Sequence, residues 1–153
     1  MNSHELNERA ATIVGRIVLV LSQLEYNVAL YLSNAVGGVD PASAEPLVSR
    51  LLFKQKVDAL SEVVKHKFAK EPACLAAFAV WYLEMDHYRV KRNAFVHGRW
   101  AFANGECINV GPGISTKSPL KERRYGLADL EKEAKQAQEL ATSFYKWAEA
   151  WPL

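Results

Sequence analysis

Apolar residues recur at intervals of three, four and seven positions over most of the chain, which is the period of an amphipathic α-helix. The pattern predicts helices over about 2–35, 45–68, 72–96 and 128–151. The second stretch places Leu47, Leu51 and Leu52 inward, and a break is expected near 53–55. These segments together account for most of the 153 residues, so the chain is predicted to be mainly helical.

Residues with special backbone preferences mark the expected helix ends. Ser3 is the expected N-cap of the first helix, and the Gly37-Gly38 pair ends the pattern. Pro72 suits the first turn of the third helix, where its missing N–H has no intrahelical acceptor to lose. Gly98 is the expected terminator of that helix, in the position where glycine commonly follows the last turn.

The period changes from helical to alternating after Gly98. Trp100 and Phe102 alternate with alanines, and a second short apolar segment covers 106–110. Asn104-Gly105 between them is a strong hairpin signal, because both turn residues need a positive φ. The segment 111–126 is predicted to be a loop.

These elements predict an all-α fold. Four to five helices with short links form an up-down bundle with one small β-hairpin insertion near 99–110, and residues 1–153 make a single domain. Because an isolated hairpin is only marginally stable in water, it is expected to pack on the bundle or on a second subunit.

The ends and the cysteines of the sequence favour a cytoplasmic protein. Residues 1–9 lack the features of a signal peptide, and the apolar run 13–21 is interrupted by Gly15 and Arg16 and is too short to span a membrane. Cys74 and Cys107 are single and far apart, so they are predicted to be reduced core thiols, and no metal site is expected.

The formal net charge of +2 conceals an uneven distribution. Segment 87–124 holds eight Lys and Arg residues and only two Glu, a net +6, so the remainder carries −4. A basic segment of this kind is typical of phosphate recognition, although long basic side chains can also simply solvate a surface.

The centre of this segment carries side chains suited to acid–base chemistry and to phosphate binding. At 100° per residue, Asp86, Asn93 and His97 fall within about 40° of one another on one helix face. His97 lies in the last turn, where the helix dipole favours an imidazolium, and Arg89 and Arg92 carry planar guanidinium groups suited to phosphate oxygens. An acid–base imidazole beside a guanidinium is what metal-independent RNA cleavage requires. Alternatively, His97-Gly98 only ends the helix and Arg92 pairs with a nearby carboxylate.

Arg92-Asn93, three residues and then His97-Gly98, closing a long helix, resembles the Arg-x4–6-His motif of the HEPN superfamily. A tryptophan two residues after the glycine fits the resemblance, as do Phe53 and Lys56 at the start of an upstream helix. The resemblance implies a homodimer whose two motif helices face each other. It also implies a metal-independent, cofactor-free endoribonuclease of a toxin–antitoxin, phage-defence or RNA-processing type. Other members of the family are non-catalytic partners.

Carried onto this chain, the resemblance makes Arg92 and His97 catalytic and gives Asn93 the role of orienting or binding the phosphate. Arg89 and Arg99 are further candidates for substrate binding. The partners expected are RNA, a second copy of the chain and an antitoxin or regulatory protein. The alternative is a non-catalytic module that binds RNA, a nucleotide or a protein, with the hairpin and the basic 117–124 segment contacting the partner.

Two carboxylates are candidates for a supporting role. Asp86 either orients the histidine chemistry or forms an ion pair with Arg89 or Lys91. Glu25 lies within the apolar stretch of the first helix, and a buried carboxylate needs a partner. Arg89 or Arg92 would make Glu25 a positioning residue, whereas an outward orientation would leave it in solvent.

Overall fold

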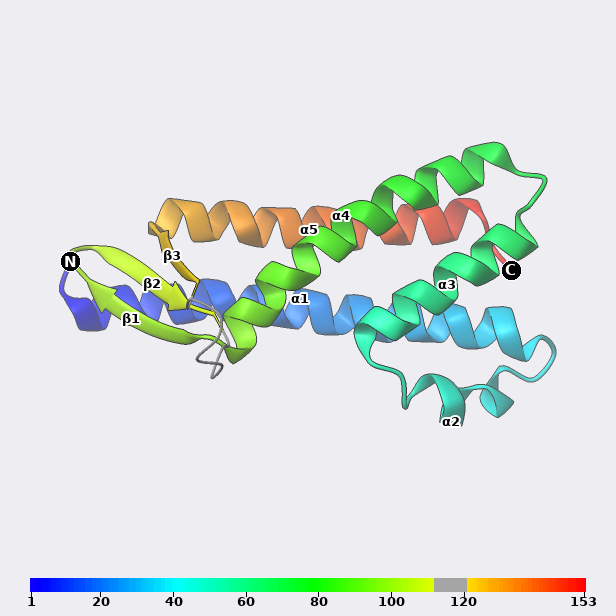
Figure 1. Cartoon of the computed structure of the whole chain (residues 1–153), viewed down its shortest axis with the longest axis horizontal. Helices are drawn as coiled ribbons and strands as arrows, with labels where there is room; N and C mark the ends of the chain where they lie inside the picture. Colours follow the sequence, from blue (N-terminus) through cyan, green and yellow to red (C-terminus); the bar gives the residue numbers. More distant parts are fainter. Residues whose placement is uncertain (112–120) are drawn as a thin grey trace. The chain divides into compact units, whose positions relative to one another are not determined.

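The computed structural model describes residues 1–111 and 121–153 (Figure 1). In chain order the elements are α1 (Ser3–Gly37), a 3-10 helix η1 (Pro41–Ser43), α2 (Glu45–Val48), α3 (Phe53–Lys67), α4 (Pro72–His97), β1 (Arg99–Ala103), β2 (Glu106–Val110), β3 (Glu122–Tyr125) and α5 (Leu127–Ala150). The predicted all-α class with a small hairpin at 99–110 is therefore confirmed.

The second predicted helix is divided differently from the prediction. It consists of a single turn, α2, and a longer helix, α3, separated by residues 49–52. Leu47 and Leu52, expected to face inward, are 70% and 72% exposed. Leu47 lies in a helix of a single turn and Leu52 in the connection before α3, so no second turn fixes which side of either segment faces the core, and their apolar character did not reveal their orientation. The backbone N–H of Leu52 donates to the Gln55 side chain at 2.8 Å, which caps the start of α3.

The N-cap of α1 is one residue earlier than expected. The Asn2 side-chain oxygen accepts a hydrogen bond from the backbone N–H of Glu5 at 2.8 Å, and Ser3 is already the first helical residue. At the other end the prediction is confirmed, because α1 ends at Gly37 and Gly38 has a φ of +60°.

The chain divides into two compact units. The first comprises 1–20 and 88–139, and the second comprises 21–87 and 140–153. Helices α1, α4 and α5 each contribute a segment to both units.

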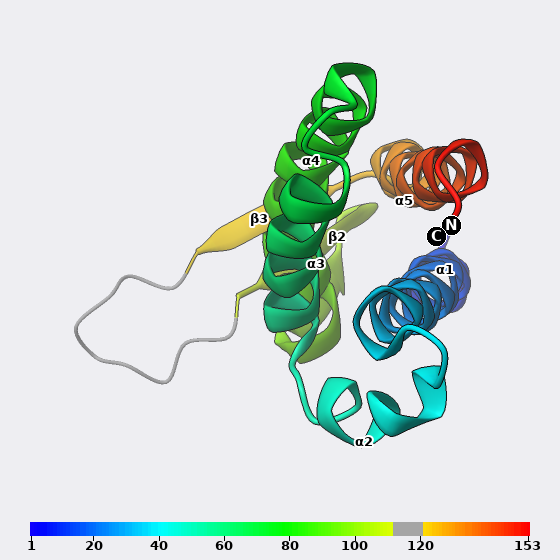
Figure 2. The ribbon, with the colours of Figure 1, turned by 90° about the vertical axis from the view of Figure 1, so that its right-hand side faces the viewer.

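A three-stranded antiparallel sheet of order β1-β2-β3 belongs to the first unit (Figure 1). Figure 2 labels its strands β2 and β3. The predicted turn is present, with Asn104 and Gly105 at φ values of 52° and 76°. In the register, Trp100, Asn109 and Arg123 occupy one row across the sheet. Because side chains alternate between the faces of a strand, residues of one row lie on the same face.

The third strand corrects the predicted 111–126 loop, because residues 122–125 are paired with β2. Tyr125 anchors this strand: it is buried, and its ring packs against Phe95 and Trp100 with centroid distances of 5.5 and 6.1 Å. On the same strand, Arg124 forms ion pairs with Glu106 and Glu122. Residues 112–120 of the predicted loop, including Lys117, lie outside the described residues.

The core of the second unit is aromatic. Its central rings pack in tilted or edge-on contacts with centroids 4.9–6.2 Å apart, and they belong to Tyr31, Phe78, Trp81, Phe144 and Trp147. The buried indole N–H groups are satisfied by backbone carbonyls, that of Trp81 by Leu140 at 3.0 Å and that of Trp147 by Cys74 at 3.3 Å.

Within the described residues, α1 alone is long and apolar enough to cross a membrane by length and composition, with a mean hydropathy of 1.4 over its best 18-residue window. The sequence predicted no such segment. Nevertheless, α1 supplies buried residues at helical spacing to both units: Leu6, Ala10, Ile13, Ile17, Leu21, Leu24, Val28, Leu32 and Ala35. This burial is compatible with the core helix of a soluble protein.

Candidate functional site

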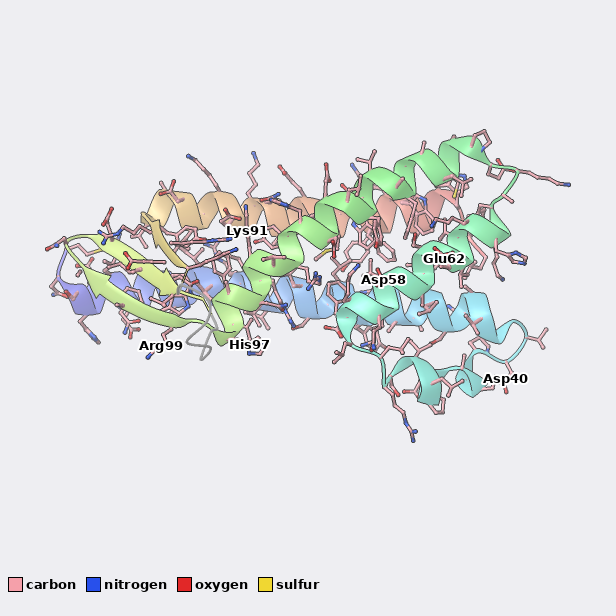
Figure 3. The ribbon with its side chains drawn as sticks, viewed as in Figure 1. Asp40, Asp58, Glu62, Lys91, His97 and Arg99 are labelled. Atoms are coloured by element: carbon pink, nitrogen blue, oxygen red, sulfur yellow. The ribbon has the colours of Figure 1, made fainter. Side chains whose placement is uncertain are left out.

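The residues of the predicted motif lie on the last three turns of α4, in the first unit. Arg92 and Asn93 are in contact, because Nη1 of Arg92 donates to Oδ1 of Asn93 at 3.2 Å. Both side chains are half-buried, as is Arg89 one turn earlier. The side chain of His97, the last helical residue, is exposed, and so is that of Arg99 at the start of β1 (Figure 3).

Two side chains from the sheet region hold the end of this helix in place. The last four carbonyls of an α-helix have no partner within the helix. That of Ala94 accepts hydrogen bonds from the backbone N–H of Gly98 at 2.9 Å and from Nδ2 of Asn109 at 3.0 Å. That of Phe95 accepts one from Nε1 of Trp100 at 3.1 Å. The turn that carries His97 is therefore tied to both β1 and β2.

Gly98 is required at this junction for its small size. A Cβ atom on Gly98 would lie 2.3 Å from the Ala94 carbonyl oxygen and 2.8 Å from both Asn109 Nδ2 and the Val110 carbonyl oxygen. The expected role as a helix terminator is confirmed in position, since α4 ends at His97. The cause is the close approach of the helix's own Ala94 carbonyl and of β2, and not a positive φ, because the glycines with positive φ among the described residues are Gly38 and Gly105.

Sequence reasoning missed Asn109. The residue is fully buried on β2, and within the described residues its Oδ1 atom is the buried side-chain polar atom that has no hydrogen-bond partner. A single polar residue between Ile108 and Val110 is a weak signal that could have drawn attention to it, since a buried amide must bond to something. The nearby Cys107 is also buried, and burial raises the pKa of its thiol, so the neutral form predominates.

Other charges of the basic segment are engaged in ion pairs. Lys91 donates to both carboxylate oxygens of Glu133 on α5, at 3.0 and 3.2 Å. The Tyr88 hydroxyl, on the same helix as Lys91, donates to the Glu133 backbone carbonyl at 2.8 Å. Lys91 thus joins α4 to α5 and does not pair with Asp86, which was one of its predicted partners. Arg124 is also paired, whereas Arg99 at this helix end and Lys121 just before β3 are exposed.

The two candidate supporting carboxylates belong to the second unit. Glu25 accepts a hydrogen bond from Lys56 Nζ at 2.8 Å, and Asp86 Oδ1 lies 3.4 Å from Lys54 Nζ. Glu25 is therefore an ion-paired residue, as expected of a partly buried carboxylate, and Lys56 on α3 provides the positive charge. The structure thus brings together Arg92 and Asn93, with His97 and Arg99 at the same helix end. It gives Asp86 and Glu25 lysine partners of their own.

The arrangement combines an exposed imidazole with a guanidinium oriented by an amide, on a helix end fixed by hydrogen bonds. Such a set can transfer protons and bind a phosphate oxygen. No group of three or more His, Cys, Asp or Glu side chains that could hold a metal ion is present in the part of the chain that the structure describes. In comparisons with known proteins, no family model matches this sequence, and neither a curated protein nor a solved structure shows significant similarity to the chain.

Proposed function

We propose that this protein is a metal-independent endoribonuclease of the HEPN type, which acts in the cytoplasm as a homodimer. A toxin, defence or RNA-processing role, with an antitoxin or regulatory partner, would follow from that assignment. The observation that carries the proposal is the exposed His97 at a helix end held by Asn109 and Trp100, on the same helix as the Arg92–Asn93 pair.

The proposed reaction is an internal transesterification. A base removes the proton of the ribose 2′-hydroxyl, whose oxygen attacks the adjacent phosphorus, and the 5′-oxygen leaves with a proton from an acid. His97 is suited to one or both proton transfers, with the second copy of His97 in the dimer as the other candidate. Arg92 would stabilise the extra negative charge on the phosphorane, and its contact with Asn93 limits the orientations that its guanidinium adopts. The products are a 2′,3′-cyclic phosphate and a free 5′-hydroxyl.

The test is cleavage of single-stranded RNA in the presence of EDTA, with identification of the end groups. We expect cyclic phosphate ends from the wild-type protein and loss of cleavage in His97→Ala, by at least the roughly 100-fold that general acid–base catalysis contributes. His66→Ala is the matched control, because His66 is an exposed histidine on α3, and it should cleave normally. Cleavage that persists in His97→Ala, or a wild-type protein that does not cleave RNA, contradicts the proposal.

One observation favours the alternative of a non-catalytic module that binds RNA phosphate. The hydrogen bond from Arg92 to Asn93 already engages the guanidinium within the motif, as in a purely structural arrangement. This alternative predicts no cleavage but RNA binding whose affinity falls linearly with salt on a logarithmic plot. Arg99→Ala would then reduce the slope of that plot by about one, whereas His97→Ala would leave binding near wild type.

A further inference from the structure

The first unit carries two aromatic rings that no step of the proposed cleavage uses. Trp100 and Phe102 lie two residues apart on β1, so their side chains are on the same face of the strand. Their ring planes are inclined by only 11°, with centroids 6.4 Å apart, whereas the other ring pairs in the described part of the chain are inclined by 31° or more. The two rings, which together form the β1 platform, therefore present parallel faces.

Both rings of the β1 platform are half-buried, although the rest of their row of the sheet is closed. Cys107 and Tyr125, which share a row with Phe102, are 0% and 8% exposed. The platform stays partly open because β1 is an edge strand, with β2 on one side only (Figure 1). Nε1 of Trp100 donates to the Phe95 carbonyl at 3.1 Å, which fixes the indole against the last turn of α4. The platform is thus accessible, and one of its rings is held in place.

The register of the hairpin places backbone hydrogen-bonding groups beside the rings. Because Asn104-Gly105 is a two-residue turn with both φ positive, Ala103 and Glu106 form a hydrogen-bonded pair, and such pairs alternate along an antiparallel ladder. The N–H and C=O groups of Trp100 and Phe102 consequently point away from β2, toward the side of β1 on which the sheet has no further strand. The edges of unpaired bases carry donors and acceptors that match such groups.

The charges on this face of the sheet favour an anionic ligand. By the register, the face consists of Trp100, Phe102, Cys107, Asn109, Arg123 and Tyr125. Its one charged residue is Arg123, and it carries no carboxylate, whereas the ion pairs of Arg124 with Glu106 and Glu122 belong to the opposite face. A strand of nucleic acid uses both features at once, because its bases stack on aromatic rings and its phosphates bind guanidinium groups.

We propose that the β1 platform stacks unpaired bases of the RNA beside the phosphate that is cut at His97, so that the substrate is a single strand. This role rests on the proposed function and adds to it the part of the RNA that is recognised. Trp100 is bonded to the helix turn that carries His97, so a base on the indole lies next to the reacting phosphate, and Phe102 takes the neighbouring base. In a duplex the bases are stacked on one another and paired, and their faces are closed to the rings.

The test measures binding of a strand that cannot be cut. A 2′-O-methyl RNA hexamer lacks the attacking hydroxyl, and a fluorescent label at its 5′ end reports binding to the full chain by anisotropy. We expect saturable binding that weakens at least about fivefold when abasic residues replace the four central bases, because the phosphates stay and the stacking is lost. Annealing the hexamer to its complement should weaken binding by a similar factor.

Variants of β1 locate the contact. Phe102→Leu keeps an apolar side chain without an aromatic face, and it should weaken binding of the hexamer by about five- to 100-fold and leave the abasic strand unaffected. Phe102→Tyr keeps the ring and should bind as the wild type does. Trp100→Phe should still bind, but without the quenching of tryptophan emission that the hexamer causes in the wild type.

Two matched controls separate the platform from other surfaces. Ala101→Thr alters the same strand on its opposite face, and Tyr145→Leu removes a 38% exposed ring from α5 in the second unit. Both variants should bind the hexamer as the wild type does.

Four results would overturn the proposal: no binding of the hexamer, equal binding of the hexamer and its abasic counterpart, equal binding of the duplex, or wild-type binding by Phe102→Leu. The first three use the unaltered protein, so they decide the matter even if a variant fails to fold. If Phe102→Leu changed the oligomeric state and not the preference for bases, the rings would be a protein contact, which also overturns the proposal. A wild-type protein that prefers the strand with bases but does not cut RNA would refute the nuclease and leave the platform standing. One that cuts RNA but binds both strands equally would refute the platform alone.

Discussion

The two units secure their helices by different means. In the second unit, α1, α4 and α5 meet through aromatic rings that contact several neighbours each, with Trp147 against Tyr31, Phe78 and Phe144. In the first unit, the end of α4 is held by single hydrogen bonds to the Ala94 and Phe95 carbonyls and by a glycine that admits no side chain. In a core of large rings, truncating one side chain lowers the free energy of unfolding in proportion to the apolar contacts it removes. A junction held by a few single contacts cannot compensate when one of them is changed. His97 lies in that junction, and Arg92 lies one turn before it.

Trp147→Ala is expected to have the largest effect on stability. The side chain is 4% exposed, and its removal deletes its ring contacts and leaves the Cys74 carbonyl without the indole N–H. We expect the free energy of unfolding to fall by about 3–5 kcal/mol, measured by urea denaturation. Trp151→Ala is the comparison, because Trp151 is half-buried and packs on Trp147 at the edge of the cluster, so a smaller loss is expected. Equal losses in the two variants would contradict a core centred on Trp147.

Gly98→Ala should be the next most damaging change, although it adds only one methyl group. The added Cβ would overlap the Ala94 carbonyl oxygen of the last helical turn and the Asn109 amide of β2, so both the last turn and its contact with the sheet must shift. We expect a loss of about 2–4 kcal/mol in the free energy of unfolding. RNA cleavage should be lost as well, under conditions in which the variant is still folded.

The control for Gly98→Ala lies in the same unit. A Cβ atom on Gly15, inside α1, would have nothing within 4 Å, and alanine is the better helix former. Gly15→Ala should therefore raise the free energy of unfolding by about 0.5–1 kcal/mol and leave cleavage unchanged. If both glycine variants behaved alike, the close approach at Gly98 would not be what fixes the helix end.

Sequence periodicity predicted the long helices and the hairpin because each is encoded by its own residues. The ends of α1, α4 and α5 lie within two residues of those predicted, and Asn104-Gly105 alone identifies the turn. The third strand, by contrast, has the sequence Glu-Arg-Arg-Tyr, in which three of four residues are charged. It is a strand because β2 offers it a pairing edge and because Tyr125 packs against Phe95 and Trp100, and neither the edge nor these rings are part of its own sequence.

The same distinction applies to the candidate site. Arg92, Asn93 and His97 were found because they lie close together on one helix. Asn109 was missed because its partner, Ala94, lies 15 residues away on a different element. Lys56 was not predicted to be the partner of Glu25 for a similar reason, since 31 residues separate them. Contacts between elements depend on how the elements pack, and a single sequence does not specify that packing.

The smallest expected effect is a dependence of stability on alkaline pH, to which each unit contributes one tyrosine. Burial, with a smaller contribution from Cys74, raises the pKa of Tyr31 from 10 to about 12, and burial raises that of Tyr88 as well. Both hydroxyls donate to backbone carbonyls, Tyr31 to Trp151 at 2.7 Å and Tyr88 to Glu133 at 2.8 Å.

A phenol whose pKa is raised on folding keeps its proton longer in the folded chain than in the unfolded one. Its stabilising contribution is therefore complete below pH 10 and is lost as the pH rises from 10 to about 12. Tyr31 is only half-buried, so solvent screening should limit its share to about 1 kcal/mol, whereas the fully buried Tyr88 should contribute more.

The measurement is urea denaturation of the wild type and of Tyr31→Phe, Tyr88→Phe and Tyr26→Phe at several pH values across this window. Tyr88→Phe should flatten the decline of stability with pH most and Tyr31→Phe less. Tyr26→Phe, at an exposed position of α1, should follow the wild type. Comparing how much Tyr88→Phe and Tyr31→Phe flatten the decline compares the two units, because each effect measures how well one unit excludes water from its tyrosine hydroxyl. If Tyr31→Phe flattened the decline more than Tyr88→Phe, the aromatic core of the second unit would exclude water from its tyrosine hydroxyl better than the first unit does. Burial of Tyr88 between α4 and α5 would then not be the reason why it keeps its proton.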